Sequence, residues 1–159
     1  MRDNEWLEQQ LQILLKNHFA NVKITNPIQI KFGREAKYRF GSIRLVSHKG
    51  IRSIKGIKSI KGLIKAVGDD TPKKSLITVT SMFAKEDVPA DVVRYTIAHE
   101  LCHYAHGFSS MNKRMFRHPH HGGIVNRELT QRGAEHLIRE FKAWLKGYRK
   151  AILAARVKI

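Results

Sequence analysis

The sequence predicts an α+β fold in which a small antiparallel sheet packs against an N-terminal helix, a helix near residue 100 and a C-terminal helix. Two observations support this prediction. Apolar residues recur at helical spacing at both ends of the chain and around residue 100, whereas short stretches between them alternate apolar and polar residues. A chain of 159 residues fits one domain, here residues 1–159.

The N-terminal helix should begin at a cap formed by Asp3 or Asn4 and run to about Ala20, with its apolar face toward the core. The apolar positions of this helix are Trp6, Leu7, Leu11, Leu14, Leu15 and Phe19.

Alternation of apolar and polar residues follows Asn26-Pro27 and predicts antiparallel strands, with turns at Gly33 and Gly41. A further strand is expected where Thr78 and Thr80 stand among apolar residues. The apolar strand positions are Ile28, Ile30 and Phe32, then Tyr38 and Phe40, then Ile43 and Leu45, and finally Leu76, Ile77, Val79 and Phe83.

A basic, low-complexity insertion at about 48–68 separates these strands. It repeats an apolar residue, a base and a small residue with a period of three, which fits neither a strand nor an α-helix. Seven bases and no acid occur between Arg44 and Lys65. One interpretation is a loop that lies along a phosphate backbone, and the other is an insertion without a role.

The next helix should start at about Pro89, after a cap at Asp87 or Val88, and stop at Gly107. A histidine-rich loop, 108–123, precedes a basic amphipathic C-terminal helix or pair of helices. Its apolar positions are Leu129, Leu137, Ile138, Phe141, Trp144, Leu145 and Tyr148. The basic tail, at about 139–159, carries Arg139, Lys142, Lys146, Arg149, Lys150, Arg156 and Lys158.

The net charge of +17 predicts a polyanionic partner, for which DNA or another nucleic acid fits best. A charged solubilising surface is the alternative. The acidic residues near the N-terminus argue against a secretory signal, and no apolar run approaches the roughly 20 residues that span a membrane. The single cysteine, Cys102, cannot form an internal disulfide. We expect a cytoplasmic protein, with nucleoid or nuclear association as a further possibility.

The motif His99-Glu100-Leu101-Cys102-His103 carries the chemistry. Positions i and i+4 of a helix lie about 40° apart, so His99 and His103 can reach one zinc ion. Zinc lowers the pKa of its bound water to about 7, and Glu100 can take the proton from that water as catalytic base. The motif therefore predicts peptide hydrolysis. Cys102 lies at the edge of the ligand face and is expected to be a small buried residue.

A catalytic zinc needs a third protein ligand. The candidates are three histidines in the loop and two carboxylates after it, namely His118, His120, His121, Glu128 and Glu135. His106 lies two turns from His99, about 10 Å along the helix axis, and should line the cleft or be satisfied locally.

The chain resembles the SprT-like zinc metallopeptidase domains, a group related to Spartan. The HExxH helix, His121-Gly122 after the loop, and Phe32-Gly33-Arg34 with Gly41–Leu45 upstream carry the resemblance, which covers Ile28 to about Phe141. It implies a zincin-like fold, His121 as the third zinc ligand and DNA-bound or DNA-crosslinked proteins as substrates. Val125 stands where the family often has an aromatic residue, and the loop before His121 is long. His118 and His120 therefore stay candidates, as does a carboxylate from Glu128 or Glu135.

The sequence thus predicts a zinc-dependent endopeptidase that acts on protein or peptide substrates associated with DNA. The alternative is a nucleic-acid-binding protein whose zinc is structural and which has no significant proteolysis. A purely structural site gains nothing from Glu100 beside the ion, which favours the peptidase. A fourth protein ligand would favour the alternative.

Overall fold

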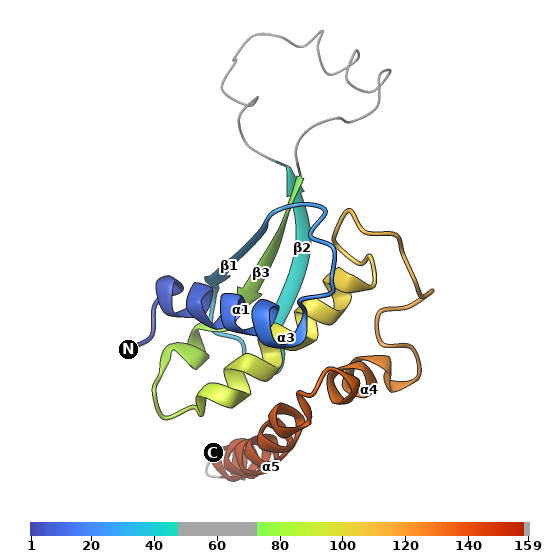
Figure 1. Ribbon diagram of the computed structural model, residues 1–159. Coiled ribbons are helices and arrows are strands. Elements are labelled where there is room, and N and C mark those ends of the chain that lie inside the picture. Colours follow the sequence, from blue (N-terminus) through green and yellow to red (C-terminus); the bar gives the residue numbers. More distant parts are fainter. Residues whose placement is uncertain (48–72, 158–159) are drawn as a thin grey trace, which may run out of the picture.

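In the part of the chain that the structure describes, the fold consists of a three-stranded sheet and four α-helices (Figure 1). The computed structural model describes residues 1–47 and 73–157. The strands are β1 (Ile28–Phe32), β2 (Gly41–Ser47) and β3 (Lys73–Val79), and the helices are α1 (Asn4–His18), α3 (Ala90–Ala105), α4 (Ile124–Gln131) and α5 (Glu135–Val157), with short 3-10 helices η2 (Ser81–Ala84) and η3 (His121–Gly123). The α+β class predicted from the sequence is confirmed. The basic insertion at about 48–68 lies outside the described residues.

The sheet is mixed, so the expectation of an antiparallel sheet was wrong for one strand pair. Its order is β1-β3-β2, with β1 parallel and β2 antiparallel to β3. The burial of the strands explains the order. β3 buries Leu76, Ile77 and Val79 and takes the centre, whereas β2 has no fully buried residue and forms an edge. The chain passes from β1 to β2 at the far edge and then to β3 in the centre, and it reverses direction at each step. β1 and β3 therefore run in the same direction.

The segment between β1 and β2 is an ordered loop, not the predicted strand at Tyr38 and Phe40. The Phe40 ring packs against Phe83, with ring centroids 5.3 Å apart, and edge-on against Trp144 at 5.5 Å. Gly41 begins β2 instead of forming a turn. The alternation around Phe40 thus reflects burial in an aromatic cluster. Likewise, Phe83 belongs to η2 and not to the end of β3.

Helix boundaries follow local capping. The Asp3 carboxylate accepts the Trp6 backbone N–H at 2.8 Å, which confirms one of the two predicted caps of α1. α1 ends at His18, two residues before the predicted end, and the next residue, Phe19, is buried. Pro89 occupies the cap position of α3 and makes no side-chain capping bond, so the predicted cap at Asp87 or Val88 was wrong by one or two residues.

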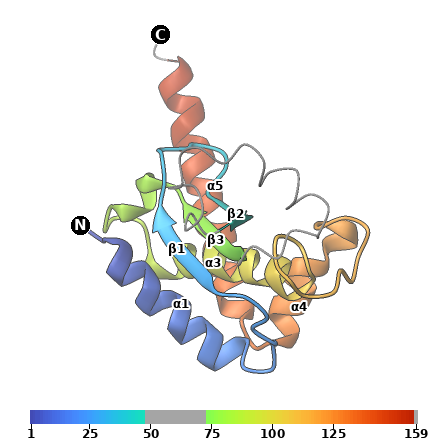
Figure 2. The same ribbon diagram turned by 90° about the horizontal axis from the view of Figure 1, so that it is seen from above.

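Helix α3 is the central element of the fold, because it contacts β2 and β3 as well as α1, α4 and α5 (Figures 1 and 2). It stops near Gly107, whose φ of +81° suits glycine. Gly133, with φ of +76°, separates α4 from α5, so the C-terminal part is a pair of helices. The second half of α5 projects from the rest of the fold (Figure 2). None of the helices in the described ranges has the length and apolar character needed to cross a membrane.

Candidate metal centre

Three histidine side chains converge at the middle of α3. His99 and His103 project from adjacent turns of the helix, and His120 reaches them from the loop that precedes η3. The Nε2 atom of His120 lies 3.0 Å from Nε2 of His99 and 3.2 Å from Nε2 of His103. The three candidate donor atoms lie within 4.8 Å of one another. The predicted pairing of His99 and His103 on one helix face is therefore present.

Hydrogen bonding alone does not account for this arrangement. An imidazole Nε2 either carries one proton or offers one lone pair, so His120 can form only one good hydrogen bond through that atom. Its two short contacts, to His99 and His103, exceed this capacity. Tetrahedral ligands at the usual Zn–N distance of about 2.0–2.1 Å would place nitrogen atoms about 3.3–3.4 Å apart. The donor set and its spacing fit a metal ion shared by the three rings.

His99 and His103 are in the protonation state that metal binding requires. Burial lowers the pKa of His99 to about 4, with a further contribution from His120. Burial also lowers the pKa of His103 to about 3, aided by the charges of its histidine neighbours. Both rings are therefore neutral near pH 7, and neutral imidazole is the form that binds a metal.

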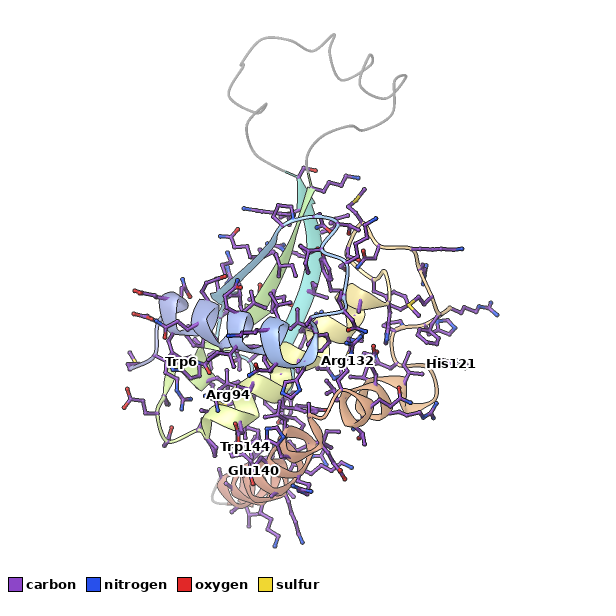
Figure 3. The ribbon with its side chains drawn as sticks, viewed as in Figure 1. Trp6, Arg94, His121, Arg132, Glu140 and Trp144 are labelled. Carbon is purple, nitrogen blue, oxygen red and sulfur yellow. The ribbon has the colours of Figure 1, made fainter. Side chains whose placement is uncertain are left out.

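The third histidine at the cluster is His120, whereas the sequence resemblance had given that place to His121. His121 begins η3 and is exposed at the loop before α4 (Figure 3), and it is not among the clustered donors. His118 is also exposed and outside the cluster. Residues 108–120 form no helix or strand. Their sequence therefore has no periodicity from which to predict whether His120 or His121 faces α3.

The Glu100 carboxyl lies in the same pocket and is 7% exposed. Burial raises its pKa to about 7, and the positive charge of Arg39 partly opposes this shift. The start of β2 comes very close to this side chain. A Cβ atom at Gly41 would lie 2.6 Å from Cγ2 of Thr96 and 3.2 Å from Oε1 of Glu100. Glycine at position 41 therefore lets the strand approach the face of α3 that carries Glu100.

The pocket around the histidines has a volume of about 560 Å³. Gly41, Ser42 and Ile43 of β2 contribute one part of its lining, and Phe108, Ser109 and Pro119 of the long loop contribute another. Sequence reasoning identified neither group. It could have found Tyr95 and Thr96, which also line the pocket, since they lie four residues before His99 and Glu100 on the same helix.

The remaining titratable candidates have other partners. The ring of His106 is buried and contacts the carboxylate of Glu128, which also accepts a hydrogen bond from Arg132 at 2.8 Å. Burial alone would raise the pKa of Glu128, but hydrogen bonds from His106 and Arg132 lower it overall. His106 thus has a local partner for Nε2, which is close to one of the two predicted outcomes, whereas its buried Nδ1 has no hydrogen-bond partner among the described residues. Glu128 binds helix partners instead of joining the three histidines.

Cys102 is fully buried, which confirms its predicted place in the core, and burial raises the pKa of its thiol. Glu135 lies exposed in the first turn of α5 and is not among the clustered donors. Comparisons of the chain with protein families, with curated proteins and with solved structures found no significant match.

Proposed function

We propose that the protein is a zinc-dependent peptidase in which His99, His103 and His120 hold the ion and Glu100 is the general base. The observation that carries this proposal is the convergence of three Nε2 atoms beside a buried carboxyl in one open pocket. Among the described residues no fourth donor joins the cluster. Three protein ligands are typical of catalytic zinc sites, whereas structural sites are closed by four.

Zinc at such a site supplies a Lewis acid that polarises a carbonyl group and lowers the pKa of water. Glu100 supplies the proton transfers. In the metal-free protein burial raises the pKa of this carboxyl to about 7, so it holds a proton more tightly than an exposed glutamate does, which suits a group that accepts a proton from water and returns it. Glu100, one residue from His99, lines the pocket without being one of the three clustered donors.

The edge of the sheet offers a place for an extended peptide. Among the described strands β2 pairs only with β3, so its other edge has free backbone N–H and C=O groups. Gly41, Ser42 and Ile43 on this strand also line the pocket. A substrate strand could add to this edge by backbone hydrogen bonds, which bind peptides with little regard to their side chains. The proposal includes that the fold is zincin-like.

The test measures zinc content and peptide cleavage together. Zinc-loaded protein should cleave an unstructured protein substrate, and the Glu100→Gln variant should lose at least about 100-fold in rate, since general bases contribute this much or more. Glu140→Gln is the matched control, because Glu140 is an exposed residue of α5. If wild type and Glu100→Gln cleave equally, or if zinc-loaded wild type cleaves nothing, the proposal is wrong.

Proteins associated with DNA are the substrates that we propose. The net charge of +17 supports this, as does the row of exposed bases on α5, which are Arg139, Lys142, Lys146, Arg149, Lys150 and Arg156. Phosphate contacts made by such side chains give affinities that fall steeply with salt. Binding to a DNA duplex should therefore weaken strongly between low and moderate salt. A flat salt response would remove nucleic acid from the proposal.

A nucleic-acid-binding protein with a structural zinc site is the second candidate, and the high positive charge favours it. The two candidates differ in one measurement. The second predicts that zinc removal unfolds the protein or abolishes DNA binding, while Glu100→Gln changes neither DNA binding nor any cleavage. Cleavage that depends on both zinc and Glu100 would exclude it.

A further inference from the structure

The described lining of the pocket carries one acidic and one basic side chain. Among the lining residues that the structure describes, Glu100 is the only acidic one and Arg39 is the only lysine or arginine. The rest of the lining is neutral or histidine. Arg39 forms no hydrogen bond and no ion pair with any residue in the ranges 1–47 and 73–157, and its one described electrostatic partner is Glu100. Arg39 is therefore an exposed cation without a hydrogen-bonding or ion-pair partner in the described ranges, and it lines the proposed catalytic pocket.

The backbone that carries Arg39 is fixed on both sides. Before it, the Ala36 N–H donates to the Thr80 hydroxyl at 2.9 Å, and that hydroxyl donates back to the Ala36 carbonyl at 3.1 Å. After it, the Phe40 carbonyl accepts the Thr80 N–H at 2.9 Å, and the Phe40 ring is held in the aromatic cluster. Thr80 is itself buried.

A third attachment comes from α5, where the Tyr148 hydroxyl donates to the Lys37 carbonyl at 3.0 Å. The loop therefore does not need to be ordered when a ligand binds Arg39. A cation on a backbone fixed in this way loses less conformational entropy on binding than one on a free loop, which strengthens its interaction with a ligand.

We propose that Arg39 is a carboxylate-binding subsite of the pocket, so that peptides bearing a carboxylate next to the scissile bond are the preferred substrates. A guanidinium presents a planar fork of donors that matches a carboxylate and can bind it through two hydrogen bonds. The carboxylate can come from an aspartate or glutamate side chain or from the C-terminus of the peptide. The subsite rests on the proposed peptidase function for its meaning as a specificity determinant.

The experiment compares matched peptides with the zinc-loaded, full-length protein. One peptide contains glutamate near the scissile bond and is amidated, the second has glutamine there and is amidated, and the third has glutamine and a free C-terminus. The kcat/KM ratio of each carboxylate peptide to the amidated glutamine peptide reports the subsite. A preference limited to one carboxylate peptide identifies the source. Arg34→Gln is the matched control, since Arg34 is an exposed base of the same loop outside the pocket lining.

Arg39→Gln should lower the ratio about tenfold, because hydrogen bonds to charged groups commonly contribute enough for a tenfold change or more. Arg34→Gln should leave it unchanged, and Arg39→Glu should reverse the preference toward a fourth peptide that has lysine in place of the glutamate. Equal ratios in wild type and Arg39→Gln would overturn the subsite. A uniform loss of rate on all peptides would also overturn it, since Arg39 would then act through Glu100.

A binding measurement tests the Arg39 subsite even if the protein is not a peptidase. If the zinc-loaded wild type cleaves none of the peptides, their binding is measured by fluorescence anisotropy at a salt concentration that screens the general surface charge. About tenfold weaker binding of a carboxylate peptide to Arg39→Gln than to Arg34→Gln would support the subsite without the peptidase. Equal binding to these two variants would overturn the subsite.

Discussion

Replacing Glu100 with glutamine should stabilise the metal-free protein at alkaline pH and have little effect on its stability at acid pH. The native protein holds the Glu100 carboxyl buried, which raises its pKa from 4.5 to about 7. Between these two values the native state keeps a proton that the unfolded state has released. Stability contributed by the neutral carboxyl is therefore fully present below about pH 4.5 and is lost as the pH rises through 7.

The size of the effect follows from the same two pKa values. Each pKa unit corresponds to about 1.4 kcal/mol, so the ionised carboxyl should cost the native state about 3 kcal/mol once the pH exceeds 7. Glutamine keeps the shape of the side chain and cannot ionise. The difference in unfolding free energy between Glu100→Gln and wild type should thus rise from near zero to about 3 kcal/mol.

Urea unfolding with a chelator, measured across this pH range, gives the difference directly. His99 and His103 contribute the opposite trend, since their lowered pKa values make the native state lose stability as the pH falls below 6.5. This contribution is common to both proteins and cancels in the difference. A difference that does not change with pH would refute the account of Glu100 as a buried, destabilised carboxylate.

Three further predictions concern the centre and its supports. His120→Ala should weaken zinc binding more than about 100-fold, beyond the usual effect of residues that only support ligands, while His121→Ala should leave the zinc stoichiometry unchanged in a competition titration. Gly41→Ala should cost about 1–3 kcal/mol in urea unfolding and reduce cleavage, since its Cβ would overlap Thr96. Glu128→Ala should cost about 3 kcal/mol in urea unfolding, because it leaves partly buried cationic and histidine partners without a carboxylate. An unchanged midpoint for either of the last two variants would contradict the packing described above.

The sequence predicted those parts of the fold that depend on local chemistry. The Asp3 cap and the apolar spacing of α1 are properties of neighbouring residues, and so is the pairing of His99 with His103 one turn apart. Each can be read from a few positions, because helix geometry fixes their relation in space.

Direction and register across the chain could not be predicted in the same way. Period-two alternation is identical in parallel and antiparallel strands, so it did not reveal that β1 and β3 run in the same direction. Phe40 alternates like a strand residue but is buried by Phe83 and Trp144, which are distant in sequence. His120 and His121 are adjacent in an irregular loop, and only tertiary contacts decide which of them faces α3.

Ser47 and Lys73 form the last pair of the β2–β3 ladder. The chain between them can therefore be replaced without altering the rest of the sheet. The ladder holds these two positions side by side, so a two-residue hairpin turn could replace residues 48–72 without changing the strand register. The proposed catalytic pocket lies at the opposite end of β2, about 20 Å away by strand rise. Closing the shorter loop would also be easier by about 2 kcal/mol in chain entropy. A shortened protein of this kind would separate what the metal centre does from what the basic segment adds.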